Sequence, residues 1–318
     1  MENGRFYRYF NNRNTVKRNN ILWLVVLMAL GLGSCTDENF TPPAFLHIDA
    51  IDLVESSNFS FMSDSGFYRS DIVAAYVTVH YPDAAEEQNI GLFRLPFTTP
   101  LLYDGTIDYV KIAPAIKQSG QIARLPYYTF YNRIKLSNVT VHTGDTLNFG
   151  TLHTTYESHA MPHLFEAFEP NEGSISTFDS TIIWERNARG EACTGYGYGR
   201  IHVPDTTTNV DCAMKIDIYP TVGDAIYLEL DIRSELPVEV QMYGREMSGT
   251  NETRKGVMVI YPTERWQHLY INLWPTFSTF DHSAGASFRL VLSALNTELT
   301  GGEVCIDNVK IISTPVTN

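Results

Sequence analysis

Aromatic side chains beside polar groups are the features of this sequence that are best suited to holding a ligand. A sugar ring presents apolar C–H faces edged by hydroxyls, and an aromatic ring with polar neighbours matches both. The candidate ligand-binding residues are Tyr196, Tyr198, Tyr243 and Trp274. Tyr196 and Tyr198 alternate with glycines, a pattern that indicates either an open loop or the glycine-rich start of a strand. We expect Trp266, by contrast, to pack in a core.

Catalysis would need a recognisable constellation of side chains, and the common ones are missing from the sequence. There is no G-x-S-x-G, H-E-x-x-H or P-loop motif, and we expect no helix after the alternating glycines to bind a phosphate. His153, His159 and His163 are spaced closely enough to reach one metal ion, but nothing fixes their geometry and we expect a solvated linker. We therefore predict that the protein is not an enzyme. A hydrolase with an unrecognised pair of carboxylates is the alternative.

Residues 1–34 have the order of an export signal. The apolar run 21–32 follows five basic residues: Arg5, Arg8, Arg13, Lys17 and Arg18. At twelve residues this run is shorter than the roughly 20 that a membrane-spanning helix needs, so we predict a cleaved signal peptide. Leu32-Gly33-Ser34-Cys35 resembles the lipobox of bacterial lipoproteins, in which the cysteine receives a lipid. The resemblance makes Cys35 the lipid-bearing first residue of the mature protein and the membrane its partner through that lipid.

Residues 35–43 form an acidic, proline-ended segment that is typical of a flexible tether. The Asp37-Glu38 pair close to Cys35 is similar to the surface-export signal of Bacteroidetes lipoproteins. The resemblance implies a protein anchored by lipid in the cell outer membrane. Exposure at the cell surface is the expected orientation, and a periplasm-facing one is the alternative.

The mature chain is strongly acidic. Removing five basic and one acidic residue from totals of 23 and 36 leaves 18 basic and 35 acidic residues, a formal charge of −17. This charge repels polyanions, and no basic stripe interleaved with aromatic residues is present. We therefore do not expect nucleic acid as a partner.

Three cysteines remain once Cys35 carries lipid: Cys193, Cys212 and Cys305. Disulfides persist in the oxidising compartment that an export signal implies. One disulfide and one buried thiol is the expected arrangement, and the sequence leaves the choice of pair open. The spacing of the cysteines does not fit a zinc site, because there is no C-x2-C pair.

The 284 residues after the signal peptide exceed what one hydrophobic core usually holds, so we predict two domains. The first, over 44–155, has short runs rich in β-branched and aromatic residues, separated by turn residues. The polar stretch 153–163 contains the boundary. The second domain, over 156–318, repeats the all-β pattern. In 226–232 the even positions are aliphatic while Tyr227, Glu229 and Asp231 should face water.

The second domain resembles galactose-binding-like jelly rolls, the fold of many carbohydrate-binding modules. Three segments carry the resemblance: the acidic and aromatic opening 164–169, the Trp-led strand 265–273, and 302–311, in which Asp307-Asn308 interrupts an apolar strand. The resemblance implies a C-terminal jelly-roll β-sandwich and a structural calcium ion, whose ligands would come from Glu166, Glu169 and Asp307. A β-bulge at Asp307-Asn308 is the alternative to calcium. The first domain resembles immunoglobulin-like sandwiches.

A lipid anchor, two β-sandwiches and no catalytic motif together favour a non-catalytic envelope lipoprotein. Such a protein would bind glycan or protein through its C-terminal β-sandwich. A structural or accessory lipoprotein of an outer-membrane assembly is the first alternative, and it predicts an exposed apolar patch instead of a ligand cleft. The fold alone does not decide between them.

Overall fold

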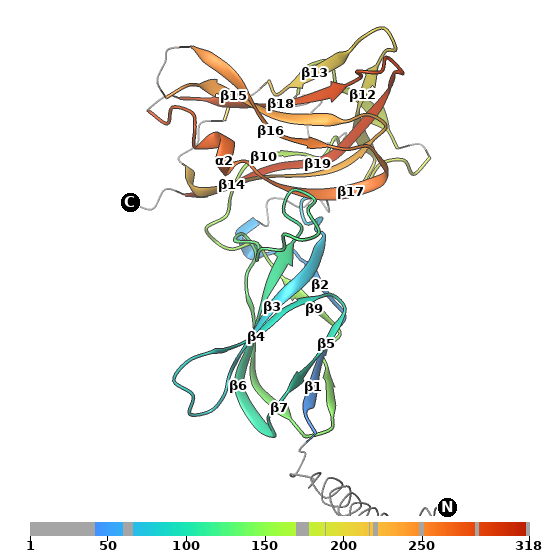
Figure 1. Ribbon diagram of the computed structural model, residues 1–318. Coiled ribbons are helices and arrows are strands. Elements are labelled where there is room, and N and C mark those ends of the chain that lie inside the picture. The colour runs from blue at the N-terminus through green and yellow to red at the C-terminus, as the bar shows by residue number, and fades with distance from the viewer. Residues whose placement is uncertain are drawn as a thin grey trace, which may run out of the picture. The chain divides into compact units, whose positions relative to one another are not determined.

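The computed structural model describes residues 42–59, 66–169, 178–187, 189–215, 217–218, 222–247, 251–283 and 286–315 (Figure 1). The expected all-β class is confirmed, because the described chain consists mainly of strands with one short α-helix. No helix among these residues is long and apolar enough to span a membrane. The predicted signal peptide, Cys35 and nearly all of the tether lie outside the described residues.

The strands β1 to β9 form what we call the N-lobe, over residues 44–154. Its four-stranded sheet has the order β4-β3-β6-β7, and the remaining strands pair as β5-β1-β8 and β2-β9. The apolar residues of the N-lobe, among them Leu46, Val77 and Ile112, form a core between these sheets. The elements are β1 (Ala44–Ile48), β2 (Ala50–Leu53), the 3-10 helix η1 (Ser57–Phe59), β3 (Ile72–His80), β4 (Gln88–Arg94), β5 (Phe97–Leu101), β6 (Gly105–Ile116), β7 (Ile134–Val141), β8 (Thr146–Asn148) and β9 (Thr151–Thr154).

The strands β10 to β19 form the C-lobe, over residues 161–315, as a sandwich of two sheets (Figure 1). The six-stranded sheet has the order β11-β12-β19-β14-β17, with β10 also pairing with β19, and the four-stranded sheet has the order β13-β18-β15-β16. The elements are β10 (Met161–Glu166), β11 (Ile183–Arg186), β12 (Gly197–Val203), β13 (Asn209–Ala213), β14 (Val222–Ser234), β15 (Val238–Arg245), β16 (Glu252–Ile260), β17 (Thr263–Asn272), α2 (Trp274–Phe277), β18 (Phe288–Leu295) and β19 (Gly302–Pro315).

Alternation along the C-lobe strands separates an apolar face from a polar one. Leu228, Leu230 and Ile232 of β14 lie in the core between the two sheets, as the sequence predicts. Glu229 and Asp231 project from the opposite face, but each is 0% exposed. The expectation that they face water is therefore wrong. The reason is that N-lobe residues cover this part of the sheet.

A third hydrophobic cluster joins the two lobes. It combines Phe67, Tyr128 and Phe130 of the N-lobe with Tyr227 and Tyr270 of the six-stranded sheet. The backbone is joined as well, because the Ser119 N–H donates to the Tyr270 carbonyl at 2.7 Å beside a parallel bridge between Gln118 and Tyr270. The N-lobe thus reaches the edge strand β17 and buries one end of the polar face.

Candidate functional site

The polar face of the six-stranded sheet carries most of the buried charged side chains of the described residues, among them Glu229, Asp231 and Lys310. We use this name for the side opposite the apolar core, formed by alternate residues of β12, β19, β14 and β17. The strand register sets the rows of side chains, since Asp231 pairs with both Asp307 and His268 across its neighbouring strands. The face has a part covered by the N-lobe and an open part beyond it.

The covered part is centred on an ion pair between Lys310 and Glu229. Lys310 Nζ lies 2.8 Å from Glu229 Oε2, and both side chains are 0% exposed. Lys310 also donates to the Phe67 carbonyl at 2.8 Å, while the Tyr128 hydroxyl donates to Glu229 at 2.7 Å. Burial alone would raise the pKa of Glu229, but Lys310 and His268 outweigh it and hold the pKa at about 2. The carboxylate is thus kept ionised at the lobe junction.

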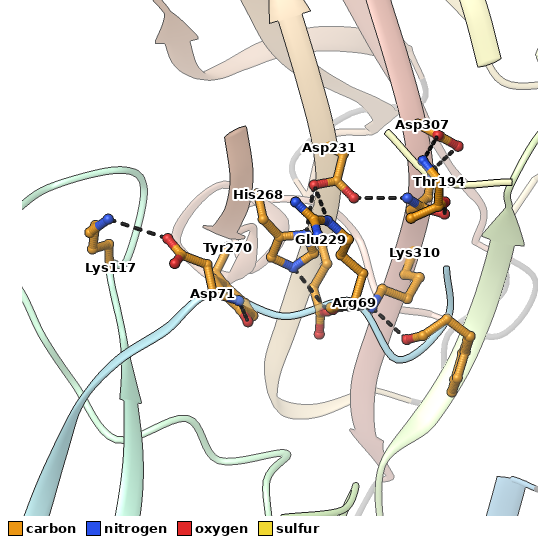
Figure 2. Close-up of polar contacts among 12 residues, drawn as sticks. Arg69, Asp71, Lys117, Thr194, Glu229, Asp231, His268, Tyr270, Asp307 and Lys310 are labelled. Atoms are coloured by element: carbon orange, nitrogen blue, oxygen red, sulfur yellow. Dashed lines mark hydrogen bonds and ion pairs between the residues drawn. The ribbon is translucent and has the colours of Figure 1, made fainter. Parts of the chain in front are cut away.

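A second buried set of charges lies beside this pair (Figure 2). His268 Nδ1 lies 3.3 Å from Asp231 Oδ1, which also accepts from Arg69 Nε at 3.2 Å. The other ring nitrogen of His268, Nε2, lies 3.7 Å from Glu229 Oε2, which is within ion-pair range but too long for a hydrogen bond. Burial opposes the charged forms of both His268 and Asp231. Their mutual contact prevails, raising the pKa of His268 and lowering that of Asp231 to about 2.

A β-bulge at Asn308 shapes the middle of the polar face. Asn308 has a positive φ of 49°, and the β14 to β19 register shifts between Glu229 and Asp231. The Asn308 amide donates to Asp231 at 2.9 Å. Asp307 accepts backbone N–H groups from Thr194 at 3.2 Å and from Asn308 at 2.8 Å. A β-bulge at Asp307-Asn308 is the alternative to calcium that we predicted from the sequence.

The three expected calcium ligands do not come together as one site. Glu166 accepts from the Phe168 N–H at 2.9 Å, whereas Glu169 accepts from the Tyr196 N–H at 2.7 Å. Asp307 accepts from the Thr194 N–H, so Asp307 and Glu169 both contact the loop before β12. Among the described residues no group of three or more His, Cys, Asp or Glu side chains is placed to hold a metal ion. Calcium binding by these three residues therefore stays a prediction.

The open part of the polar face contains a hollow of about 730 Å³, which we call the sheet hollow. Arg233 and Cys305 line it, together with three carboxylates: Glu235, Glu264 and Glu303. The Arg233 guanidinium lies over the Trp266 ring, 5.6 Å from its centroid. Among the described residues Arg233 has no carboxylate within ion-pair distance.

Trp266 lines a second hollow of about 380 Å³, the interlobe hollow, and its ring contacts Arg233, which lines the sheet hollow. The N-lobe side of the interlobe hollow is formed by Arg69, Ser70, Asp71, Lys117, Gly120 and Ile122, and the C-lobe side by Trp266, Gln267, His268 and Leu269. The Trp266 indole N–H donates to the Glu191 carbonyl at 2.7 Å. The half-buried indole is not a member of the core cluster, so the expectation that it packs inward is wrong.

The four aromatic residues predicted to bind ligand lie at different places. Tyr196 is on the loop before β12 and is 72% exposed, whereas Tyr198 is only 6% exposed and packs edge-on against Trp266 at 6.2 Å. Tyr243 lies in β15 of the other sheet, below Arg289. Trp274, in α2, packs against the apolar core. Only Tyr196 and Tyr198 are therefore near the polar face.

The predicted disulfide is not formed, because Cys193, Cys212 and Cys305 are free thiols. Cys212 lies in the apolar core between the sheets. Cys305 alternates with the core residues Val304 and Ile306, so its thiol is on the polar face, where Arg233 Nη2 donates to Sγ at 3.6 Å. Cys193 lies in the loop before β12, and burial and the nearby carboxylate of Asp231 raise its pKa to about 12.

The charged residues of the lobe junction were not predicted from the sequence. The available signal was Lys310 between Val309 and Ile311, a lysine in an apolar strand. Such a lysine must be paired if the strand is buried on both sides. Its partner could not be read from the sequence, because Phe67 and Arg69 are more than 200 positions away.

No protein-family model matches the chain, and no curated protein matches it. Among solved structures, the family 11 carbohydrate-binding module of a cellulosomal cellulase of Clostridium thermocellum is 13% identical, covers 49% of this chain and 98% of its own, and has a TM-score of 0.33. The family 30 module of another cellulosomal cellulase of C. thermocellum is 18% identical, covers 50% and 95%, and has a TM-score of 0.31. A family 61 module in complex with β-1,4-galactotriose is 12% identical, covers 46% and 99%, and has a TM-score of 0.31. The chain is thus similar to carbohydrate-binding modules over about half its length.

Proposed function

We propose that this chain is a non-catalytic glycan-binding protein and that the saccharide binds on the polar face around Trp266. The observation that carries the proposal is the position of Trp266, a half-buried indole that lines the interlobe hollow and contacts Arg233 of the sheet hollow. Its contacts with the Glu191 carbonyl and with Arg233 hold the ring in place before any ligand arrives. A fixed ring loses little conformational freedom on binding, which favours affinity.

The chemistry of the sheet hollow suits a polyhydroxylated ligand. Glu235, Glu264 and Glu303 supply carboxylate acceptors for sugar hydroxyls, and Arg233 supplies guanidinium donors. The volume of about 730 Å³ lies within the range of roughly 300–1,000 Å³ that small-ligand sites occupy. In this proposal the apolar C–H face of a sugar lies against Trp266, and Arg233, which contacts that ring, binds its hydroxyls at the sheet hollow.

The proposal of a non-catalytic role is supported by the burial of the perturbed acids. A hydrolase needs a carboxyl group with a displaced pKa that meets the substrate. Asp307 has the raised pKa here, but it is 0% exposed and bonded to Thr194. Glu229 and Asp231 are equally buried and are paired with Lys310, His268 and Arg69.

The test is a glycan-array screen of the purified protein, followed by calorimetry. The first probes are a β-1,3-1,4-mixed-linked tetrasaccharide, xylohexaose and β-1,4-galactotriose, because solved modules with similar folds were studied with these ligands. We expect Trp266→Ala to weaken binding of any hit at least tenfold, about 1.4 kcal/mol. Tyr261→Ala is the matched control, since Tyr261 is 76% exposed on the turn before β17 and lines neither hollow.

Two results would contradict the proposal. One is a folded protein that binds nothing across a broad array. The other is a Trp266→Ala variant that stays folded, as judged by thermal unfolding, and binds the hit as tightly as the unchanged protein does. The first result would favour the accessory role in an envelope assembly, which crosslinking in the native cell would then address.

We further propose that the protein is anchored in the outer membrane through lipid on Cys35 and that the N-lobe is an immunoglobulin-like spacer. Support comes from the lipobox-like Leu32-Gly33-Ser34-Cys35. Growth with an alkyne-labelled fatty acid should label the unchanged protein and leave a Cys35→Ser variant unlabelled. Equal labelling of the unchanged protein and the Cys35→Ser variant would overturn the proposed lipid anchor.

A further inference from the structure

The two hollows beside Trp266 differ in charge. The sheet hollow has three carboxylates and one guanidinium among its lining residues. The interlobe hollow has Arg69 and Lys117 but a single lining carboxylate, Asp71. The lining of the sheet hollow is therefore more acidic than that of the interlobe hollow, in which Arg69 pairs with Asp231 and Lys117 pairs with Asp71, so the two hollows favour different chemical groups.

The two cations of the interlobe hollow keep donors for a ligand. Arg69 donates to Asp231 through Nε, and its side chain is 39% exposed. Lys117 Nζ lies 3.2 Å from Asp71, and its side chain is 35% exposed. A guanidinium has five N–H donors and an ammonium has three, so neither group is saturated by these contacts. Figure 2 shows Lys117 and Arg69 on either side of Asp71.

The basic wall of the hollow is fixed in place against β17. The Asp71 N–H donates to the Tyr270 hydroxyl at 3.0 Å, and the Ser119 N–H donates to the Tyr270 carbonyl at 2.7 Å. These bonds hold the segments that carry Arg69 and Lys117 on the edge strand that carries Trp266. The cations and the indole are therefore arranged before a ligand arrives.

We propose that the interlobe hollow is a subsite for an acidic sugar residue, whose carboxylate is bound by Arg69 and Lys117 while its ring lies against Trp266. The inference rests on the proposed function, because it extends the same Trp266 site onto the N-lobe. Guanidinium and ammonium groups form charge-assisted hydrogen bonds with a carboxylate, which neutral sugars lack. The N-lobe would thus contribute directly to ligand selection.

The experiment follows the indole N–H resonance of Trp266 by NMR during titration of the full protein. Glucuronic and galacturonic acid are the probes, and glucose and galactose are their neutral counterparts. We expect saturable shifts with at least one of the two acids and at least tenfold weaker binding of its neutral counterpart. Lys117→Met should remove this preference. Lys135→Met, which removes an exposed lysine above the Tyr109 ring of the N-lobe, should keep it.

Each outcome separates the subsite from the proposed function. No shift with either acid, equal binding of the neutral sugars, or an unchanged preference in Lys117→Met would overturn the subsite. A neutral glycan hit that depends on Trp266 would still support the proposed function in those cases. Conversely, an acidic sugar could bind in a Lys117-dependent way while no neutral glycan on the array binds. That result would support the subsite and overturn the proposed role of the sheet hollow.

Discussion

At the residue scale, Asp307 links the stability of the polar face to pH. Burial and the nearby carboxylates of Asp231 and Glu169 raise its pKa to about 8, against about 3.9 in an unfolded chain. The folded state therefore holds a proton that the unfolded state has lost over this interval. The resulting stabilisation is complete below about pH 4 and is lost as the pH rises through about 8.

We expect Asp307→Asn to flatten this dependence, because the amide keeps an oxygen for the Thr194 N–H and does not titrate. The measurement is the free energy of unfolding in denaturant at several pH values between about 5 and 8. The slope of the unchanged protein should be negative there and that of the variant closer to zero. Equal slopes for the two proteins would show that Asp307 does not hold the extra proton.

Below about pH 4 the free energy of unfolding depends on pH with the opposite sign, because it rises as the pH rises. Glu229 and Asp231 both have a pKa of about 2 in the folded protein, below their ordinary values near 4. Their stabilisation is present above about pH 4 and is lost as the pH falls toward 2. We therefore expect the free energy of unfolding to be largest near about pH 4 to 5, as a pH series of thermal unfolding would show. A maximum above pH 7 would contradict both assignments.

At the element scale, Gly197 of β12 determines how closely Trp184 of β11 and the segment after β10 approach. A Cβ added at Gly197 would lie 2.3 Å from the Phe168 carbonyl oxygen and 2.4 Å from the Trp184 indole nitrogen. That indole donates to the same carbonyl at 2.6 Å. The glycine therefore allows an aromatic side chain and a backbone group to meet above the strand.

We expect Gly197→Ala to destabilise the protein by about 1–3 kcal/mol, because the clash is partly with backbone that cannot move aside. Gly256→Ala is the control, since its Cβ would meet the end of the flexible Glu239 side chain. Denaturant unfolding of the two variants measures the difference. If both variants lose the same stability, the effect is a general loss of glycine and not the close packing at β12.

The strands themselves were predictable, whereas the side chains around the site were not. Alternation in 226–232 predicts the core side of β14 because aliphatic residues recur at every second position. The same alternation assigned Glu229 and Asp231 to water, since a charged residue is normally exposed. Glu229 is buried against Tyr128, 101 positions away, and Asp231 against Arg69, 162 positions away. Periodicity within a strand contains no information about such contacts.

Trp266 illustrates the same limit at the ligand site. A Trp-led strand resembles one that packs inward, and the next residues toward the core, Leu269 and Ile271, do so. Trp266 lies on the other face because it alternates in step with His268 and Tyr270. The strand's position in the sequence was thus predictable, but the face on which its first aromatic residue lies depends on the register.

At the scale of the whole molecule, the buried charges make the two lobes depend on one another. Lys310 of β19 binds the carbonyls of Phe67 and Arg69 in the N-lobe and the carboxylate of Glu229 in the C-lobe. Charges taken out of water are tolerated only while they remain paired. Separation of the lobes would therefore expose an ion pair together with the aromatic cluster around Phe67 and Tyr270.

This dependence predicts the effect of Lys310→Met. The substitution leaves the Glu229 carboxylate buried without its ammonium partner, a change that costs about 3–5 kcal/mol. Adding Glu229→Gln should restore part of that stability, because the amide oxygen can still accept from Tyr128 and carries no charge. In the chain without residues 1–34, which include Trp23, tryptophan fluorescence reports on the C-lobe alone, since Trp184, Trp266 and Trp274 all lie there. Far-ultraviolet circular dichroism reports on both lobes. The two signals should follow one transition in the unchanged protein and separate in Lys310→Met, because the N-lobe and the C-lobe would then unfold independently. A single transition in the variant would mean that the aromatic cluster, and not the buried ion pair, couples the lobes.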